Sequence, residues 1–304
     1  MNNQLPNLLI LGAAKAGTTT LYDLLAEQEN VYMSFVKEPM FFSRDDYFQR
    51  GLDWYSQTFF AGSETHSIRG EATPHYLYWA DKVAPRIHES LPVSQLKLVI
   101  ILRDPVDRAY SWYWNMIKEG EEDISFEEAL SQEPERLKLN HETLRSKGSM
   151  IYGYAKGSSF VSQIKEFLKV FPRENFFFLL QEDLLSPDSG ALLGFYDFLG
   201  LSNIRSGDPL SRKNPSTLPQ SKTLQGWLRN QSGVKEVAKK LLPFRLRYSM
   251  KQYLMRKNTR PFAYPEMSAQ TRVELLAKFA PEILELQSLL GRDLSHWLAG
   301  ERAK

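Results

Sequence analysis

The feature that most constrains the fold lies in the first twenty residues. An apolar run, Leu8 to Leu11, is followed by the glycine-rich turn Gly12-Ala13-Ala14-Lys15-Ala16-Gly17, and helical spacing begins at Thr19. Gly12 and Gly17 permit backbone conformations that other residues resist. Amides at the start of the helix point toward one anion, and the helix dipole favours negative charge there. The sequence therefore predicts a buried strand, a turn and a helix arranged around a phosphate group.

The same alternation of strand and helix continues along the chain. Short apolar runs at Asn7 to Leu11, Leu96 to Leu102 and Phe176 to Leu180 are typical of buried strands in a parallel sheet. Helical spacing is found between and after them, at Thr19 to Gln28, Val83 to Leu91, Pro105 to Lys118, Phe160 to Val170 and Ala191 to Leu199. This order predicts an α/β fold of three layers, with a central parallel β-sheet flanked by helices.

The remaining segments predict one domain, residues 1 to 304, with a helical C-terminal region from about 223 to 304 packed on it. Residues 132 to 148 are polar and predict a surface excursion. Residues 235 to 260 concentrate lysine and arginine. We interpret this basic region either as a solvated helix face or as a docking surface for an anionic glycan or lipid headgroup, which would bring peripheral membrane contact.

Composition narrows the classes of function. The chain has 304 residues, a formal net charge of +2 and no cysteine. So small a net charge argues against a general nucleic-acid binder, and the lack of cysteine excludes disulfides and cysteine chemistry. The N-terminus lacks a basic segment followed by a long apolar one, and no run approaches the roughly 18 to 20 apolar residues that span a bilayer. We expect a cytoplasmic protein.

The glycine turn differs from that of nucleotide triphosphatases at one decisive position. Those enzymes carry a lysine directly after the second glycine, where it reaches the terminal phosphates. This chain carries Thr18 there, and its lysine, Lys15, lies inside the turn. The strand that ends at Leu102 is followed by Arg103, which suits phosphate better than metal, with Asp104 one residue further on. We expect one phosphate to be bound without a metal ion.

These motifs resemble a known family. The pattern Gly-x-x-Lys-x-Gly-Thr-Thr is similar to the 5′-phosphosulfate loop of sulfotransferases that use 3′-phosphoadenosine 5′-phosphosulfate (PAPS), and Arg103-Asp-Pro-x-x-Arg108-x-x-Ser111 is similar to their 3′-phosphate motif. Lys37 to Phe42 and Gly70 to Tyr76 resemble segments of the heparan sulfate, or carbohydrate, branch. Leu290 to Trp297 is also similar to the family. A P-loop-type fold is expected from this resemblance.

The resemblance implies roles for individual residues in binding the donor. Arg103 and Ser111 are expected to bind the 3′-phosphate. Arg212 and Lys213 lie in a basic loop later in the chain, which is expected to close over that phosphate. Arg108 is open between a ligand contact and a salt bridge that supports the fold. No metal is implied, and the product is adenosine 3′,5′-bisphosphate. The residues expected around the 5′-phosphate are Ala14, Lys15, Ala16, Gly17, Thr18, Thr19 and Thr20.

For the transfer itself, Lys15 is the candidate cation at the departing oxygen. Glu38 is our candidate general base, because the matching glutamate is assigned as the base in the heparan-type relatives and apolar neighbours would raise its pKa. His75 is the alternative base.

The acceptor stays open. Ala72 stands where the heparan-type pattern has lysine, which weakens a transfer of heparan-like specificity. A hydroxyl or amine of a carbohydrate or glycolipid is expected, and the alternative is a small metabolite. A P-loop kinase or NTPase, or a nucleotide binder without catalysis, are the remaining readings, and the sequence leaves the oligomeric state undetermined.

Overall fold

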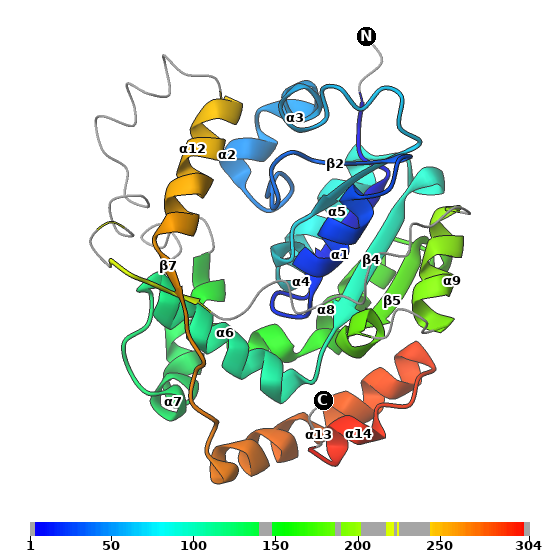
Figure 1. Ribbon diagram of the computed structural model, residues 1–304. Coiled ribbons are helices and arrows are strands. Elements are labelled where there is room, and N and C mark those ends of the chain that lie inside the picture. The colour runs from blue at the N-terminus through cyan, green and yellow to red at the C-terminus, as the bar shows by residue number, and fades with distance from the viewer. Residues whose placement is uncertain are drawn as a thin grey trace.

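The computed structural model describes residues 4–139, 148–185, 190–201, 217–221, 224 and 244–300 (Figure 1). Its strands are β1 (Leu8–Gly12), β2 (Val31–Met33), β3 (Ile68–Ala72), β4 (Lys97–Leu102), β5 (Phe176–Leu180), β6 (Thr217–Pro219) and β7 (Thr259–Pro261). Its main helices are α1 (Thr18–Ala26), α2 (Asp45–Phe48), α3 (Gly51–Phe59), α4 (His75–Tyr78), α5 (Ala80–Ser90), α6 (Pro105–Glu119), α7 (Phe126–Arg136), α8 (Phe160–Leu168), α9 (Gly190–Leu199), α12 (Phe244–Lys257), α13 (Ala269–Leu290) and α14 (Ser295–Leu298).

Five parallel strands form the central sheet in the order β2-β3-β1-β4-β5. The three predicted strands are present as β1, β4 and β5, and the predicted α/β fold with a parallel sheet between helices is confirmed. β2 and β3 were not predicted. Because β1 lies between β3 and β4, the loops that follow these three strands meet at one edge of the sheet, where ligands bind in open α/β sheets.

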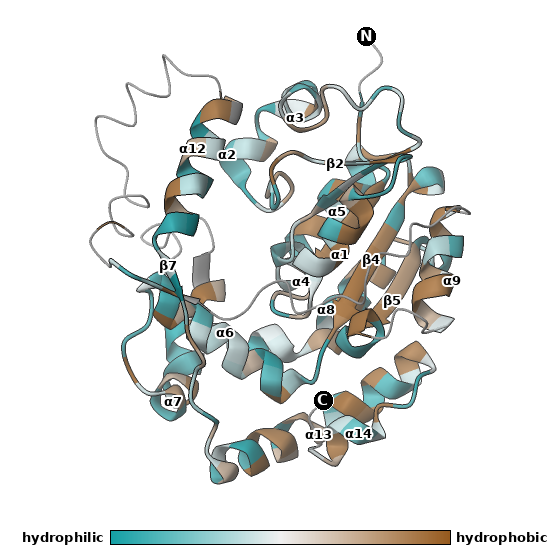
Figure 2. Cartoon of the chain, viewed as in Figure 1, coloured by the Kyte–Doolittle hydropathy of each residue, from teal (hydrophilic) through white to brown (hydrophobic). Residues whose placement is uncertain are grey.

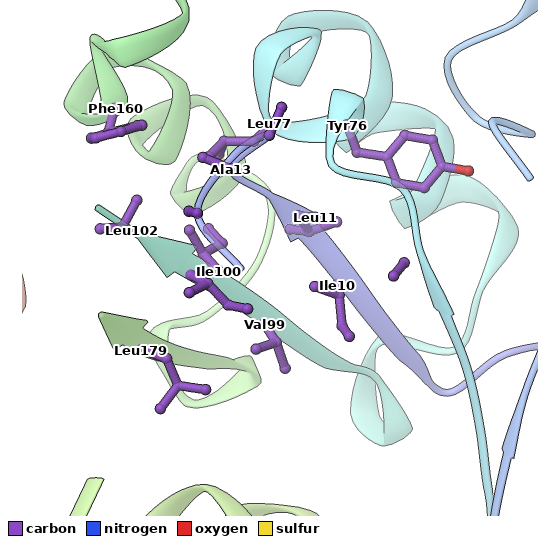
Figure 3. Close-up of a cluster of buried hydrophobic side chains, with 14 of the residues drawn as sticks. Ile10, Leu11, Ala13, Tyr76, Leu77, Val99, Ile100, Leu102, Phe160 and Leu179 are labelled. Carbon is purple, nitrogen blue, oxygen red and sulfur yellow. The ribbon is translucent and has the colours of Figure 1, made fainter. Parts of the chain in front are cut away.

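Helices cover both faces of the sheet. The chain moves one way across the sheet from β1 to β2 and the other way from β3 to β4, so right-handed crossovers place α1 on one face and α5 on the opposite one. α8 packs against α5 and shares that face. Figure 2 shows that β4 and β5 are apolar almost throughout, and every residue of β1 is buried. In Figure 3, Leu77 from α4 lies beside Ala13 of the glycine turn.

The prediction that residues 132 to 148 form a surface excursion is wrong for the first part of the segment. Residues 132–136 complete helix α7, and Glu133 is buried because its carboxylate accepts hydrogen bonds from the amides of Ala155 (2.9 Å) and Lys156 (2.8 Å). Residues 140–147 lie outside the described part of the chain. A buried carboxylate with backbone partners is indistinguishable from a solvated one in the sequence alone.

In the described part of the C-terminal region, residues 244–300, helices α12, α13 and α14 agree with the predicted helical character. Residues 225–243 lie outside the described part of the chain. β7 pairs antiparallel with β6 between α12 and α13. α13 packs on α6 and α8, and α14 on α13, so these two helices cover the lower end of the domain in Figure 1. Within the residues described, no helix has both the length and the apolar character required to cross a bilayer.

Candidate functional site

The turn between β1 and α1, residues 12–17, is called the glycine loop below. Gly17 has a φ of 106° and Lys15 a φ of 74°, so both occupy the left-handed region. That conformation is easy for glycine and uncommon for lysine. A Cβ on Gly12 would lie 2.6 Å from the Cβ of Leu77, so only glycine fits there. The loop is therefore held in a tight turn over α4, with Lys15 half-buried at its centre.

The first turn of α1 offers its amides to an anion. Gly17 is the N-cap residue, no side-chain hydrogen bond caps the helix, and no acidic residue occupies its first turn. Thr18 is buried, and Thr19 and Thr20 are half-buried. Unpaired amides at a helix start carry partial positive charge. An anionic group such as a 5′-phosphate fits this position.

Arg103 meets the glycine loop from the adjacent strand. It follows β4, and its Nη1 donates to the carbonyl oxygen of Lys15 at 3.4 Å. Its Nη2 lies 3.8 Å from Asp107, whose nearer partner is Arg272 of α13. The structure thus brings together the two halves of the predicted site, the loop after β1 and the arginine after β4.

Arg108 is a support of the loop and has no surface for a ligand. Its side chain is 1% exposed. Its Nε donates to the carbonyl of Ala14 at 3.1 Å, and its Nη1 donates to the carbonyls of Gly153 (3.3 Å) and Tyr154 (3.1 Å). Burial lowers the pKa of this guanidinium to about 10. Of the two roles considered for Arg108, ligand contact and support of the fold, the structure shows support. The support comes from hydrogen bonds to backbone carbonyls and not from the salt bridge expected from the sequence.

Ser111 lies one turn after Arg108 on α6, and it is 6% exposed. Residues three apart share a helix face, so Ser111 lies on the face that carries Arg108 to the glycine loop. Asp104, one residue beyond the position where a triphosphatase usually carries a magnesium-binding aspartate, is the N-cap of α6. Its carboxylate accepts from the amides of Val106 (2.7 Å) and Asp107 (3.1 Å).

Glu38 reaches the site from the segment after β2. Its φ is 67° and that of Met40 is 58°, and the Glu38 amide donates to the carbonyl of Ala72 at 3.0 Å. The carboxylate pairs with Lys37 at 3.0 Å, and its side chain is 31% exposed. The predicted apolar enclosure is wrong, because the rings of Phe41 and Phe42 turn away into a buried aromatic cluster with Tyr55.

Glu71, at the carboxyl end of β3, is a site residue that the sequence interpretation missed. It is 0% exposed and accepts hydrogen bonds from the hydroxyls of Tyr55 (2.5 Å), Thr73 (2.6 Å) and Tyr76 (3.0 Å). Burial raises its pKa from 4.5 to about 7, although the three hydroxyls act in the opposite direction. The signal in the sequence was a carboxylate between a glycine and residues bearing hydroxyls.

Two of the hydroxyls that donate to Glu71, those of Thr73 and Tyr76, also hold the segment that carries Glu38. The oxygen of Thr73 accepts from the Met40 amide at 3.3 Å, and that of Tyr76 accepts from the Phe42 amide at 3.2 Å. Each hydroxyl therefore accepts from the segment and donates to Glu71. Such chains of hydrogen bonds are cooperative in a low dielectric. Through these two hydroxyls, Glu71 stabilises the strained backbone around Glu38.

His75, the alternative base, is enclosed. It is the first residue of α4, is 5% exposed, and its ring meets Trp112 edge-on at 6.3 Å. Glu38 is the more accessible of the two candidates. Arg212 and Lys213 lie outside the described residues.

Helix α12 borders the Glu38 segment. Tyr248 contacts the ring of Phe35 edge-on at 5.7 Å. Burial raises the pKa of Tyr248, and the charge of Glu38 adds to that rise.

Residues 5–239 match the model of the sulfotransferase domain. The membrane-associated sulfotransferase kil1 of Dictyostelium discoideum is 35% identical over 111 residues, which are 36% of this chain and 22% of that protein. Mouse heparan sulfate glucosamine 3-O-sulfotransferase 3B1 is 28% identical over 207 residues, 67% of this chain and 48% of the relative. The chain thus spans about half or less of these curated relatives.

Among solved structures, a sulfotransferase from Alicyclobacillus acidocaldarius covers 96% of this chain and 98% of its own, with a TM-score of 0.66 and 27% identity. The glycine loop, Arg103 and the sheet order all lie within the region that the sulfotransferase model matches. This chain belongs to the sulfotransferase family.

Proposed function

We propose that this protein transfers a sulfuryl group from PAPS to a hydroxyl or amine of a carbohydrate acceptor, such as a polysaccharide or glycolipid. The observation that carries the proposal is the contact between Arg103 and the glycine loop. One nucleotide with two separate phosphates fits this pair of anion sites. The 5′-phosphate would lie at the start of α1, and the 3′-phosphate beside Arg103 and Ser111.

The chemistry requires charge neutralisation at one oxygen and removal of one proton. The acceptor oxygen or nitrogen attacks sulfur, the bond from sulfur to the 5′-phosphate oxygen breaks, and adenosine 3′,5′-bisphosphate leaves. Lys15, half-buried at the centre of the glycine loop, neutralises charge on the departing oxygen. Glu38 takes the acceptor proton, which is worth about 10²- to 10⁴-fold in rate for a well-placed base.

The acceptor class rests on the relatives and on the accessibility of Glu38. The mouse relative is named for heparan sulfate glucosamine. The Glu38 side chain is partly exposed, and an accessible base suits a sugar chain better than an enclosed one would. Ala72 removes the lysine of the heparan-type pattern, so the sugar contacts differ from those of that branch.

The test is transfer of labelled sulfate from PAPS to a panel of desulfated polysaccharide, glycolipid and small hydroxylated or amino compounds, with EDTA present. We expect labelled polysaccharide or glycolipid from the wild type and from K138A, a variant at an exposed lysine that pairs with Glu135, and none from K15A. Label only on the small compounds would contradict the carbohydrate acceptor. Phosphate transfer from ATP with magnesium, without sulfate transfer, would contradict the whole proposal.

A further inference from the structure

Helix α12 has two apolar faces, one of which packs on the domain. On the inner face, Phe244 meets Phe59 of α3 at 6.1 Å and Tyr248 meets Phe35 at 5.7 Å. These contacts attach α12 to α3 and to the segment that carries Phe35, and Figure 1 shows α12 next to α2.

The outer face carries a second apolar stripe that is open to solvent. Its members recur at helical spacing on the side opposite Tyr248, and Figure 2 shows brown bands along α12 between the teal ones. An amphipathic helix in a globular protein normally turns its apolar stripe inward. A concentrated exposed patch marks an interaction site. The exposed members of this stripe are Leu246 (48%), Met250 (51%), Tyr253 (61%) and Leu254 (36%).

Positive charge flanks the stripe. The sequence of α12, FRLRYSMKQYLMRK, contains five lysine or arginine residues and no acidic residue, although the whole chain has a net charge of only +2. Lys251, Arg256 and Lys257 are exposed. At 100° per residue, Lys251 lies on one side of the stripe and Arg256 on the other.

The combination of an apolar stripe and flanking cations favours an anionic bilayer over a soluble polyanion as the partner of α12. A sulfated or carboxylated glycan would be recognised by the cations alone, and the four apolar side chains would gain nothing from it. A helix whose exposed apolar stripe is bordered by cations fits the interface of an anionic bilayer, where the stripe enters the headgroup boundary and the cations lie over the lipid phosphates.

We propose that α12 docks the protein on the surface of an anionic lipid bilayer, with the stripe inserted shallowly and the flanking cations at the headgroups. The proposal does not depend on the donor chemistry. Its consequence for the site is positional. The inner face of the same helix touches Phe35, close to Glu38, so docking brings the acceptor side of the site within roughly one helix diameter, about 10–12 Å, of the membrane.

The test is co-sedimentation of the full chain with vesicles of phosphatidylcholine alone or mixed with phosphatidylserine. We expect binding only to the mixed vesicles, and weaker binding as salt rises. K251Q/R256Q should weaken partition roughly 25-fold, and L246S/M250S should weaken it about tenfold or more. The control is L193S/L284S, which changes two exposed leucines on other helices and should bind as the wild type does. Circular dichroism verifies that every variant is folded.

Two results would overturn the proposal. One is equal sedimentation of the wild type and folded L246S/M250S, since the apolar stripe would then have no part in binding. The other is failure to bind mixed vesicles together with tight binding to soluble heparin, which would assign the cations to a glycan.

Discussion

Replacing Glu71 by glutamine should remove a large pH dependence of stability. Burial raises the folded pKa of Glu71 from 4.5 to about 7. Below the unfolded pKa the carboxyl is protonated in both states, and its contribution to folding is fully present. That contribution is lost as the pH rises through the folded pKa, because the unfolded chain then ionises more easily. The folded and unfolded pKa values differ by about 2.5 (7 − 4.5). At about 1.4 kcal/mol per pKa unit, Glu71 contributes roughly 3 kcal/mol to the pH dependence of the free energy of unfolding.

The assay is urea unfolding followed by tryptophan fluorescence, at intervals from pH 5 to pH 8, for the wild type and E71Q. Other buried carboxylates titrate equally in both proteins, so the difference in free energy of unfolding isolates Glu71. We expect the wild type to lose most of roughly 3 kcal/mol relative to E71Q across this range. E135Q, an exposed carboxylate variant, should follow the wild type. Parallel curves for the wild type and E71Q would refute the reasoning.

Three further predictions concern the reaction and the loop. K15A should lower kcat far more than it weakens binding of adenosine 3′,5′-bisphosphate in calorimetry, and equal losses would assign Lys15 to ground-state binding. E38Q should lower the rate of sulfate transfer about 10²-fold or more while it preserves affinity for that product, and an undiminished rate would move the base to His75. R108K should lower the free energy of unfolding by about 2–4 kcal/mol, because buried carbonyls lose their donors. The variant R260K, at an exposed arginine, should unfold as the wild type does, and equal stability of R108K and R260K would contradict the support assigned to Arg108.

The sequence predicted those parts of the fold that follow from apolar runs and glycine turns. β1, β4 and β5 are almost wholly apolar, so their pattern identified them. β3 has the sequence IRGEA and was not predicted, because its two charged side chains find hydrogen-bond partners inside the protein. Glu71 does so with three hydroxyls, and Arg69 with the carbonyls of Leu5 (2.9 Å) and His66 (2.9 Å). Pattern rules count such residues as exposed.

The site was predicted in outline, and its supports were not. The glycine loop and Arg103 were recognisable because their residue types and order carry phosphate chemistry. The burial of Arg108 under Ala14 depends on the close approach of Gly157, where an added Cβ would lie 2.3 Å from the arginine Nη1. Contacts of this kind are set by tertiary packing and leave no local pattern.

The most direct measurement of the central claim is a crystal structure with adenosine 3′,5′-bisphosphate. We predict the 5′-phosphate at the amides that begin α1, the 3′-phosphate within hydrogen-bond distance of Arg103 and Ser111, and the Lys15 ammonium beside the 5′-phosphate oxygens. A nucleotide bound elsewhere, or one whose 3′-phosphate points away from Arg103 and Ser111, would contradict the account.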